Sequence, residues 1–202
     1  ISGPVVIIGV YGPTGSSKGE QREESNTMWD IQRRHMAKLP DDERQENPRE
    51  QFLYDLQAEV MRHKMDGYRV IVAGDFNLDW HPGTEQRARM NLFLEQSHLV
   101  HTHARLWPAD ACRTWWGADE SSWLDYVLLD NDSWNQGAGV GSGMEKQRLH
   151  ASDHSRVTAR VDFRAIVGER RGTKQVRFQP RVRQFKCTHP AHKPVYLEIS
   201  KL

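Results

Sequence analysis

The stretch that decides the fold of this chain is RVIVAGDFN, residues 69–77. Its first five residues are mostly apolar and β-branched, a pattern that predicts a buried strand ending at Gly74. Asp75 and Asn77 follow at the end of this strand, where α/β proteins expose reactive side chains. An Asp there can take a proton from water, and an Asn pointing to the same side can donate to an oxyanion. A turn rich in Gly, Asp and Asn is the alternative interpretation.

Towards the N-terminus, a second apolar run and a capped helix flank this strand. Val5 to Ile8 is apolar at every position, which predicts a strand buried on both faces that leads into Tyr11-Gly12-Pro13. Residues 14–47 are polar and predict a long surface excursion with one helical piece around Met28 to Leu39. Asn47, followed by Pro48 and Glu50, indicates the start of a helix that Gly67 closes.

Towards the C-terminus, helical and β-type patterns continue to alternate. A helix is expected from Glu85 to about Ser97, with Met90, Phe93 and Leu94 on its inner face. Shorter β-like runs follow at residues 112–116, 123–129 and 156–163. Interleaved strands and helices indicate an α/β or layered α+β body.

Two further groups of polar residues are candidates for a catalytic or metal-binding role. Asp125 lies inside the apolar run Trp123 to Leu129, and a buried carboxylate must be paired or ligate a metal. Ser152-Asp153-His154 places a carboxylate next to an imidazole just before a predicted strand. Orienting that histidine would satisfy the buried carboxylate.

Composition limits the classes of protein that the chain can belong to. Its 202 residues are 37% hydrophobic and 27% charged, enough for one sizeable core. No apolar run approaches the roughly 18 to 20 residues that span a bilayer, so we expect no membrane partner. Cys112 and Cys187 lie far apart, which excludes a disulfide scaffold and a four-cysteine zinc module and favours an intracellular location.

Charge divides the chain into an acidic body and a basic tail. Residues 1–163 hold 18 Lys and Arg against 25 Asp and Glu, whereas residues 164–186 hold eight basic side chains against one Glu. We therefore predict a domain over residues 1–163 and a basic tail or linker over residues 164–202. The tail either contacts phosphates or stays a solvated linker, and its composition favours the linker.

Five short motifs, taken together and in order, resemble the endonuclease/exonuclease/phosphatase superfamily, which is also described as DNase I-like. The motifs closest to those of abasic-site and non-LTR retrotransposon endonucleases are Val10-Tyr11-Gly12-Pro13, Gly74-Asp75-Phe76-Asn77, Thr114-Trp115, Ser122-Trp123-Leu124-Asp125-Tyr126 and Ser152-Asp153-His154. The resemblance spans residues 4–163. It implies an α+β fold, a four-layer α/β/β/α sandwich with the site at one end.

The resemblance also implies a catalytic role for five residues. Asp75 would be the general base or water-orienting carboxylate, and Asn77 would hydrogen-bond the scissile phosphate. Asp125 would orient His154, whose imidazolium would stabilise the negative charge that develops on the phosphoryl group. Tyr11 would reach the phosphate through its hydroxyl.

Metal and substrate contacts follow from the same resemblance. Asp153 would contribute to a divalent metal site, and oxygen ligands of this kind suit Mg²⁺ or Mn²⁺. Trp115 is the best candidate for a substrate-facing ring. Thr14 stands where abasic-site endonucleases carry an Asn that contacts the substrate, and Trp123 and Ser155 stand where relatives often carry Arg. The family's further Asn and metal-binding Glu come from strands that precede Val5, so we expect a sandwich that is incomplete at the N-terminus.

The function implied is a metal-dependent phosphodiester hydrolase, an endonuclease domain of a retroelement-type protein. Its partners would be nucleic acid, namely DNA, and a reverse transcriptase module in the same polypeptide, and its location would be nuclear. One alternative is a phosphoesterase on inositol phosphates or another phosphoester, although Phe76 stands where inositol phosphatases usually carry Leu. A second alternative is an inactive remnant that acts as a binding module.

Several other features favour structural interpretations. His101 and His103 alternate as on a strand and are expected at the surface, because no third metal ligand is fixed by the sequence. Cys187 with His189 and His192 likewise lacks a fourth zinc ligand. Residues 137–143 hold four glycines and predict a mobile loop.

Overall fold

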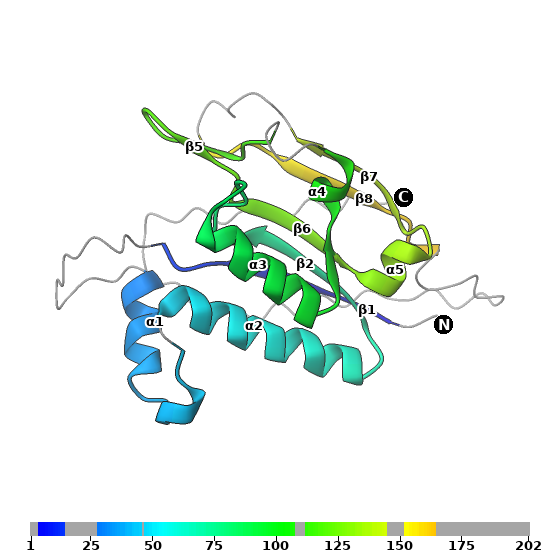
Figure 1. Cartoon of the computed structure of the whole chain (residues 1–202). Helices are drawn as coiled ribbons and strands as arrows, with labels where there is room; N and C mark the ends of the chain where they lie inside the picture. Colours follow the sequence, from blue (N-terminus) through cyan, green and yellow to red (C-terminus); the bar gives the residue numbers. More distant parts are fainter. Residues whose placement is uncertain (1–3, 15–27, 46, 108–111, 145–151, 165–202) are drawn as a thin grey trace. The chain divides into compact units, whose positions relative to one another are not determined.

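The computed structural model describes residues 4–14, 28–45, 47–107, 112–144 and 152–164 (Figure 1). Its helices and strands, in chain order, are β1 (Val5–Tyr11), α1 (Met28–Met36), the 3₁₀ turn η1 (Asp41–Glu43), α2 (Pro48–Met65), β2 (Arg69–Asp75), α3 (Glu85–Gln96), β3 (Leu99–His101), α4 (Thr102–Leu106), β4 (Trp115–Trp116), β5 (Ser121–Ser122), β6 (Asp125–Asp130), α5 (Asn131–Asn135), β7 (Gly139–Met144) and β8 (Val157–Val161). The predicted α+β class is confirmed.

A four-stranded sheet in the order β1-β2-β6-β3 forms the centre of the fold. Strand β1 runs parallel to β2, whereas β6 is antiparallel to both β2 and β3. The register places Tyr11 beside Asp75 and Asp75 beside Asp125. Since residues paired across neighbouring strands point to the same face, these three side chains form one row at one end of the sheet.

Apolar layers cover both faces of this sheet. Helices α2 and α3 lie over one face (Figure 1), where Val70 and Val72 of β2 pack in one core cluster with Leu56 of α2 and Phe93 of α3. On the opposite face, Ile71 and other sheet residues pack against α5 and β8. Burial on both faces explains why β2 reads as a continuous apolar run.

The helix α2 begins and ends where the sequence predicts. The side chain of Asn47 accepts hydrogen bonds from the backbone amides of Arg49 and Glu50, and Pro48 occupies the first turn. Gly67 follows the C-cap at a φ of 81°, in the left-handed region that glycine tolerates best. The predicted helix over residues 85–97 is also confirmed as α3, with Met90, Phe93 and Leu94 buried.

The expectation that strand β1 is buried on both faces is wrong. The strand lies at the edge of the sheet, and its residues alternate between half-buried and exposed, with Ile7 56% exposed. Its apolar sequence is therefore only partly covered by the described residues. An edge strand of this kind presents unpaired backbone groups on its free side.

Two other expectations are wrong for the same physical reason, namely long-range pairing. Residues 139–144, expected within a glycine-rich loop, form β7 because they pair in register with β8. His101 and His103, expected at the surface, are 3% and 1% exposed, because β3 pairs with β6 and α4 begins at Thr102. The short elements β3, α4 and α5 were not predicted.

The strand expected at residues 112–116 is limited to Trp115–Trp116, and Trp123 is fully buried in the core. No helix within the described residues is long and apolar enough to cross a membrane. The basic segment 165–202, together with Cys187, His189 and His192, lies outside the described residues. The boundary between a domain at 1–163 and a tail at 164–202 therefore stays a prediction.

Candidate active site

The row of side chains at the end of the sheet is completed by His154. Its Nδ1 lies 2.8 Å from Oδ2 of Asp125, and its Nε2 lies 3.9 Å from Oδ2 of Asp75. An isolated β-bridge to Trp115 holds the His154 backbone in place. The structure thus assembles a carboxylate, an imidazole and a second carboxylate from three segments that are far apart in the sequence.

The Asp125 carboxylate controls the charge of His154. Its hydrogen bond is the largest effect on the His154 pKa and raises that pKa above the ordinary value, and the nearby carboxylates of Asp75 and Asp153 raise it further. With Nδ1 donating to Asp125, Nε2 points towards Asp75. The separation of 3.9 Å between Nε2 and Oδ2 is too long for a direct hydrogen bond, so both atoms stay available to a water or a phosphoryl oxygen beside them.

Asp75 has the properties of a base that works near neutral pH. Burial raises the pKa of its carboxyl to about 6, and the neighbouring Asp125 contributes in the same direction. The hydrogen bond from the backbone amide of Asn77, with a distance of 2.9 Å to Oδ1, partly offsets this rise. Since Oδ1 is held by Asn77, Oδ2 is the oxygen that faces the substrate side.

Asn77 lies in a tight turn after β2. The strand ends at Asp75, so strand alternation does not extend to Asn77, whose φ is 51°. Its Nδ2 donates to the carbonyl of Gly12 at 3.0 Å, which ties the end of β2 to the end of β1. An amide carries two N–H donors, so one remains for a phosphate. The predicted contact of Asn77 with a scissile phosphate stays a prediction.

Two glycines allow this close approach of β1 and β2. A Cβ on Gly12 would lie 2.1 Å from the carbonyl oxygen of Phe76, and one on Gly74 would lie 2.0 Å from that of Val10. The amide of Gly12 also donates to the carbonyl of Asp75 at 2.7 Å. Any larger residue at either position would push the strand ends apart.

Tyr11 and Thr14 flank the row on the β1 side. Tyr11 is 55% exposed, and its hydroxyl hydrogen-bonds with the Thr14 side chain. Burial of the hydroxyl is the largest of the effects that raise the Tyr11 pKa, and Asp75 adds to it. Tyr11 therefore stays protonated and available as a hydrogen-bond donor.

Asp153 and Trp115 flank the row on the His154 side. The indole Nε1 of Trp115 donates to Oδ2 of Asp153 at 2.9 Å, and Trp115 is half-buried beside His154. The structure thus brings all eight of the sequence-predicted site residues to one end of the sheet. Their individual roles stay predictions.

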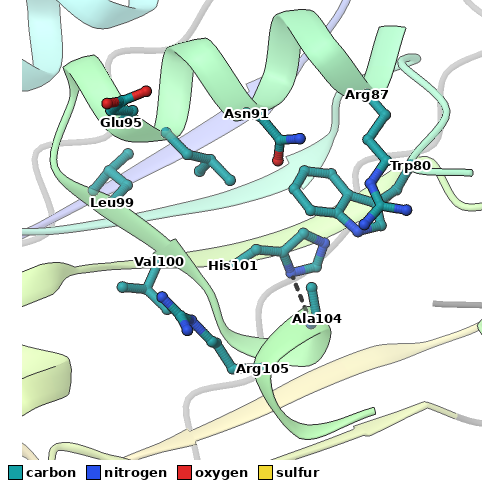
Figure 2. A pocket seen from close by; sticks show the side chains of 10 residues that line it. Trp80, Arg87, Asn91, Glu95, Leu99, Val100, His101, Ala104 and Arg105 are labelled. Atoms are coloured by element: carbon teal, nitrogen blue, oxygen red, sulfur yellow. Dashed lines mark hydrogen bonds between the residues drawn. The ribbon is translucent and has the colours of Figure 1, made fainter. Parts of the chain in front are cut away.

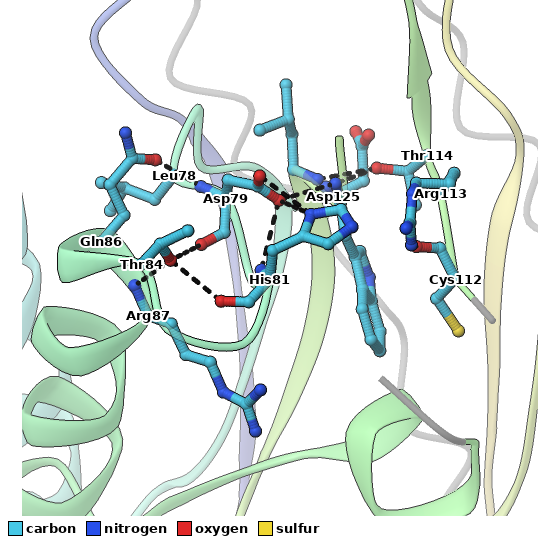
Figure 3. A network of polar contacts seen from close by, with 12 residues as sticks. Leu78, Asp79, His81, Thr84, Gln86, Arg87, Cys112, Arg113, Thr114 and Asp125 are labelled. Atoms are coloured by element: carbon cyan, nitrogen blue, oxygen red, sulfur yellow. Dashed lines mark hydrogen bonds and ion pairs between the residues drawn. The ribbon is translucent and has the colours of Figure 1, made fainter. Parts of the chain in front are cut away.

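Thr114 is a positioning residue that was quoted only as part of a motif. It is fully buried, and its Oγ1 accepts from the backbone amides of Leu124 and Asp125 at 2.8 and 3.0 Å (Figure 3). Its carbonyl accepts from the amide of Ser155 at 2.6 Å. A single side chain and its carbonyl therefore fix the backbone beside both Asp125 and His154.

Asp79 supports the backbone just before Asp125 and was not predicted as a site residue. Its Oδ1 accepts from the backbone amide of Trp123 at 3.1 Å and from Nδ1 of His81 at 2.7 Å (Figure 3). Asp79 is half-buried, and the sequence gives no signal of its contact with the Trp123 amide, which lies 44 residues further along the chain.

The site offers ligands that suit a hard divalent cation. Within the described residues, Asp75, Asp125 and His154 each present one ligand atom, all within 4.8 Å of one another. The imidazole is a weaker candidate, because its Nδ1 is already bonded to Asp125. Carboxylate oxygens are the ligands that Mg²⁺ and Mn²⁺ prefer, so the donor set fits such an ion. Asp153, the predicted metal ligand, is not a member of this group.

Comparisons with known proteins agree with the fold and with the family suggested by the motifs. Residues 8–154 match the family described as Endonuclease/Exonuclease/phosphatase. No curated protein matches the chain.

Two solved structures are similar in fold. One is a 3′-5′ exonuclease, NExo, from Neisseria meningitidis, with 17% identity and a TM-score of 0.52. The other is described as the 3′ phosphatase NExo from Neisseria bound to product DNA hairpin, with 16% identity and a TM-score of 0.51. In both comparisons the match covers 78% of this chain and 61% of the other, so the chain spans less than two thirds of their length.

Proposed function

The chain belongs to the endonuclease/exonuclease/phosphatase family, and from this premise we propose that it is a metal-dependent phosphodiester hydrolase acting on nucleic acid. The observation that carries the proposal is the array of Asp125, His154 and Asp75, with His154 bonded to one carboxylate and open towards the other. A phosphodiester is an anion, so its hydrolysis needs a base for water and fixed positive charge near the phosphoryl oxygens.

Asp75 supplies the base. With a pKa of about 6 it is ionised at neutral pH, and its Oδ2 can take the proton of a water that attacks phosphorus. The hydrogen bond from Asn77 to Oδ1 keeps the carboxylate in this orientation.

His154 supplies the positive charge. Asp125 favours the protonated imidazole and turns the ring, so that Nε2–H faces the space beside Asp75. In that space it donates to a phosphoryl oxygen as negative charge develops there. The Tyr11 hydroxyl and the second N–H of the Asn77 amide are further donors to the same group.

The metal is expected to occupy the carboxylate-rich part of the site. The second oxygen of Asp125, together with Asp153 next in the chain to His154, would hold Mg²⁺ or Mn²⁺, which when bound supplies Lewis-acid stabilisation of phosphate charge.

We further propose that DNA is the substrate and that the chain is an endonuclease domain of a retroelement-type protein. The DNA hairpin named for one structural neighbour supports the first part, and the five motifs support the second. A reverse transcriptase module in the same polypeptide and a nuclear location are parts of this proposal. Hydrolysis of phosphomonoesters is a second candidate, favoured by the 3′ phosphatase named for the same neighbour.

The test compares substrates under one set of conditions. Supercoiled plasmid, single-stranded RNA, a 3′-phosphorylated DNA oligonucleotide and an inositol phosphate are incubated with the protein and Mg²⁺, with and without EDTA. We expect plasmid cleavage that EDTA abolishes and that His154→Ala lowers by at least about 100-fold. His35→Ala, which removes an exposed histidine of α1, is the matched control and should cleave normally.

Two other outcomes of this experiment would favour a different function. Release of phosphate from the oligonucleotide or the inositol phosphate, without plasmid cleavage, would favour a phosphomonoesterase. Retention of plasmid binding with no turnover on any substrate would favour an inactive binding module.

A further inference from the structure

A cavity of about 390 Å³ lies between α3, β3 and α4 (Figure 2), and none of its lining residues belongs to the candidate active site. Trp80, Arg87, Asn91, Glu95, His101 and Arg105 supply its polar lining. Leu94, Leu99 and Val100 supply apolar surface. A volume of this size falls within the range of small-molecule sites, which combine apolar walls with a few placed polar groups.

Two buried ring nitrogens of the lining have no hydrogen-bond partner among the described residues. They are Nε1 of Trp80, which is 4% exposed, and Nε2 of His101, which is 3% exposed. The two rings contact each other edge to face, with centroids 4.7 Å apart. Buried polar atoms are almost always paired in native proteins, so two orphans on adjacent rings of one cavity require a partner.

Both orphan atoms are donors. The indole N–H of Trp80 can only donate. The Nδ1 of His101 accepts from the backbone amide of Ala104 at 3.4 Å, capping α4 (Figure 2). Burial lowers the pKa of His101 well below its usual value, so the ring is neutral and carries its single proton on Nε2. A partner for these two ring nitrogens must therefore be a hydrogen-bond acceptor.

The charges around the two donors favour an anionic acceptor. The guanidinium of Arg87 stacks over the Trp80 ring, 5.4 Å from its centroid, whereas the exposed Arg105 extends towards Val100 (Figure 2). No ion pair of either arginine is found within the described part of the chain. Glu95, the one acidic lining residue, lies beside Leu99, at the end of the cavity opposite Arg87 (Figure 2).

We propose that this cavity binds a small organic anion whose phosphate or carboxylate oxygens accept from Trp80 and His101 beside Arg87. The apolar body of the ligand would rest on Leu99 and its neighbours. Phosphate and carboxylate share this chemistry, because both present several acceptor oxygens to two N–H donors and a guanidinium. The site is independent of the proposed hydrolase activity and shares no residue with it.

The test follows the indole N–H resonance of Trp80 in ¹⁵N-labelled protein, assigned with Trp80→Phe. The probes are inorganic phosphate, dAMP and benzoate, each titrated at constant ionic strength. We expect a saturable shift of the Trp80 resonance with at least one probe. Tighter binding of dAMP than of inorganic phosphate would identify an organic phosphate, and tighter binding of benzoate would identify a carboxylate.

Arginine variants separate a built site from general charge. Arg87→Gln should weaken the binding of the effective probe by about tenfold or more, because it removes a charge-assisted contact. Arg160→Gln removes the same charge from an exposed position on β8 and should leave binding unchanged. His101→Asn can still cap α4 but lacks the second ring donor, and it should also weaken binding.

Two results would overturn the proposal. One is a Trp80 resonance that no probe shifts saturably. The other is equal weakening by Arg87→Gln and Arg160→Gln. Binding at the candidate active site would instead shift the resonance of Trp115, so failure of this proposal is distinguishable from failure of the proposed function.

Discussion

Replacing Asp75 with Asn should stabilise the fold near neutral pH although it removes the proposed base. The carboxyl has a pKa of about 6 in the folded chain, above its ordinary value of 3.8. Below pH 3.8 it is protonated in both the folded and the unfolded chain, so its ionisation costs no stability. As the pH rises through 6, ionisation in the buried site lowers the free energy of unfolding.

The size of this effect follows from the pKa shift. Each pKa unit corresponds to about 1.4 kcal/mol, so a rise of about two units sets an upper limit of about 3 kcal/mol. The side chain is 12% exposed, and residual contact with solvent reduces the expected gain to about 2 kcal/mol. For a chain of this length, that gain raises the melting temperature by about 4 to 8 °C.

The assay is thermal unfolding of wild type and Asp75→Asn at pH 4 and pH 7.5, in EDTA so that no divalent metal compensates the charge. Asn preserves the acceptor for the Asn77 amide, so the native geometry is retained. We expect a clear gain at pH 7.5 that nearly disappears at pH 4. Asp119→Asn, at an exposed position, is the control and should change neither value. A variant that gains nothing at pH 7.5, or gains equally at both pH values, would refute the argument from burial.

Three other predictions concern the support of the site, the helix cap and the tail. Thr114→Val leaves the buried amides of Leu124 and Asp125 without an acceptor, so it should lower the free energy of unfolding by about 1 to 3 kcal/mol in a urea titration and reduce turnover, whereas Thr114→Ser should retain both. Asn47→Ala removes the cap of α2 and should cost about 1 kcal/mol in the same titration. If residues 164–186 contact DNA phosphates, their deletion should flatten the slope of log affinity against log salt by about 0.9 per lost contact, and an unchanged slope would identify a linker.

Local signals in the sequence predicted the elements that depend on local chemistry. The start of α2 at Asn47-Pro48 was predictable because a helix cap needs only the neighbouring residues. Strand β2 was predictable because a continuous apolar run of this length is typical of a strand buried on both faces. Asp75 and His154 were recognisable because one ends a predicted strand and the other precedes one, and Asp125 because a carboxylate inside an apolar run needs a partner. Their meeting at 3.9 Å or less was implied by the resemblance and not by spacing.

Elements that depend on distant partners could not be predicted. The glycines of β7 give no side-chain pattern, and the strand exists because β8 pairs with it. His101 alternates with His103 as on an exposed strand, yet β3 is covered from both sides and α4 begins directly after it. Strand β1 shows the converse, because its fully apolar sequence predicts more burial than the described residues provide.

The supporting residues of the site were missed because they act through backbone contacts. Asp79 accepts from an amide 44 residues further along the chain, and Thr114 accepts from amides 10 and 11 residues away. Side-chain type alone does not reveal such contacts. Only the three-dimensional arrangement shows that one buried hydroxyl fixes the strand that carries Asp125.

The most direct test of the central claim is the rate of plasmid cleavage by Asp75→Asn at saturating Mg²⁺, beside wild type and Asp119→Asn. If Asp75 takes the proton of the attacking water, the variant should cleave at least about 100-fold more slowly while it melts no lower than wild type. The Asp119→Asn control should cleave at the wild-type rate. Near-wild-type cleavage by Asp75→Asn would contradict the account, because the phosphodiester would then not be broken at the group of Asp75, Asp125 and His154.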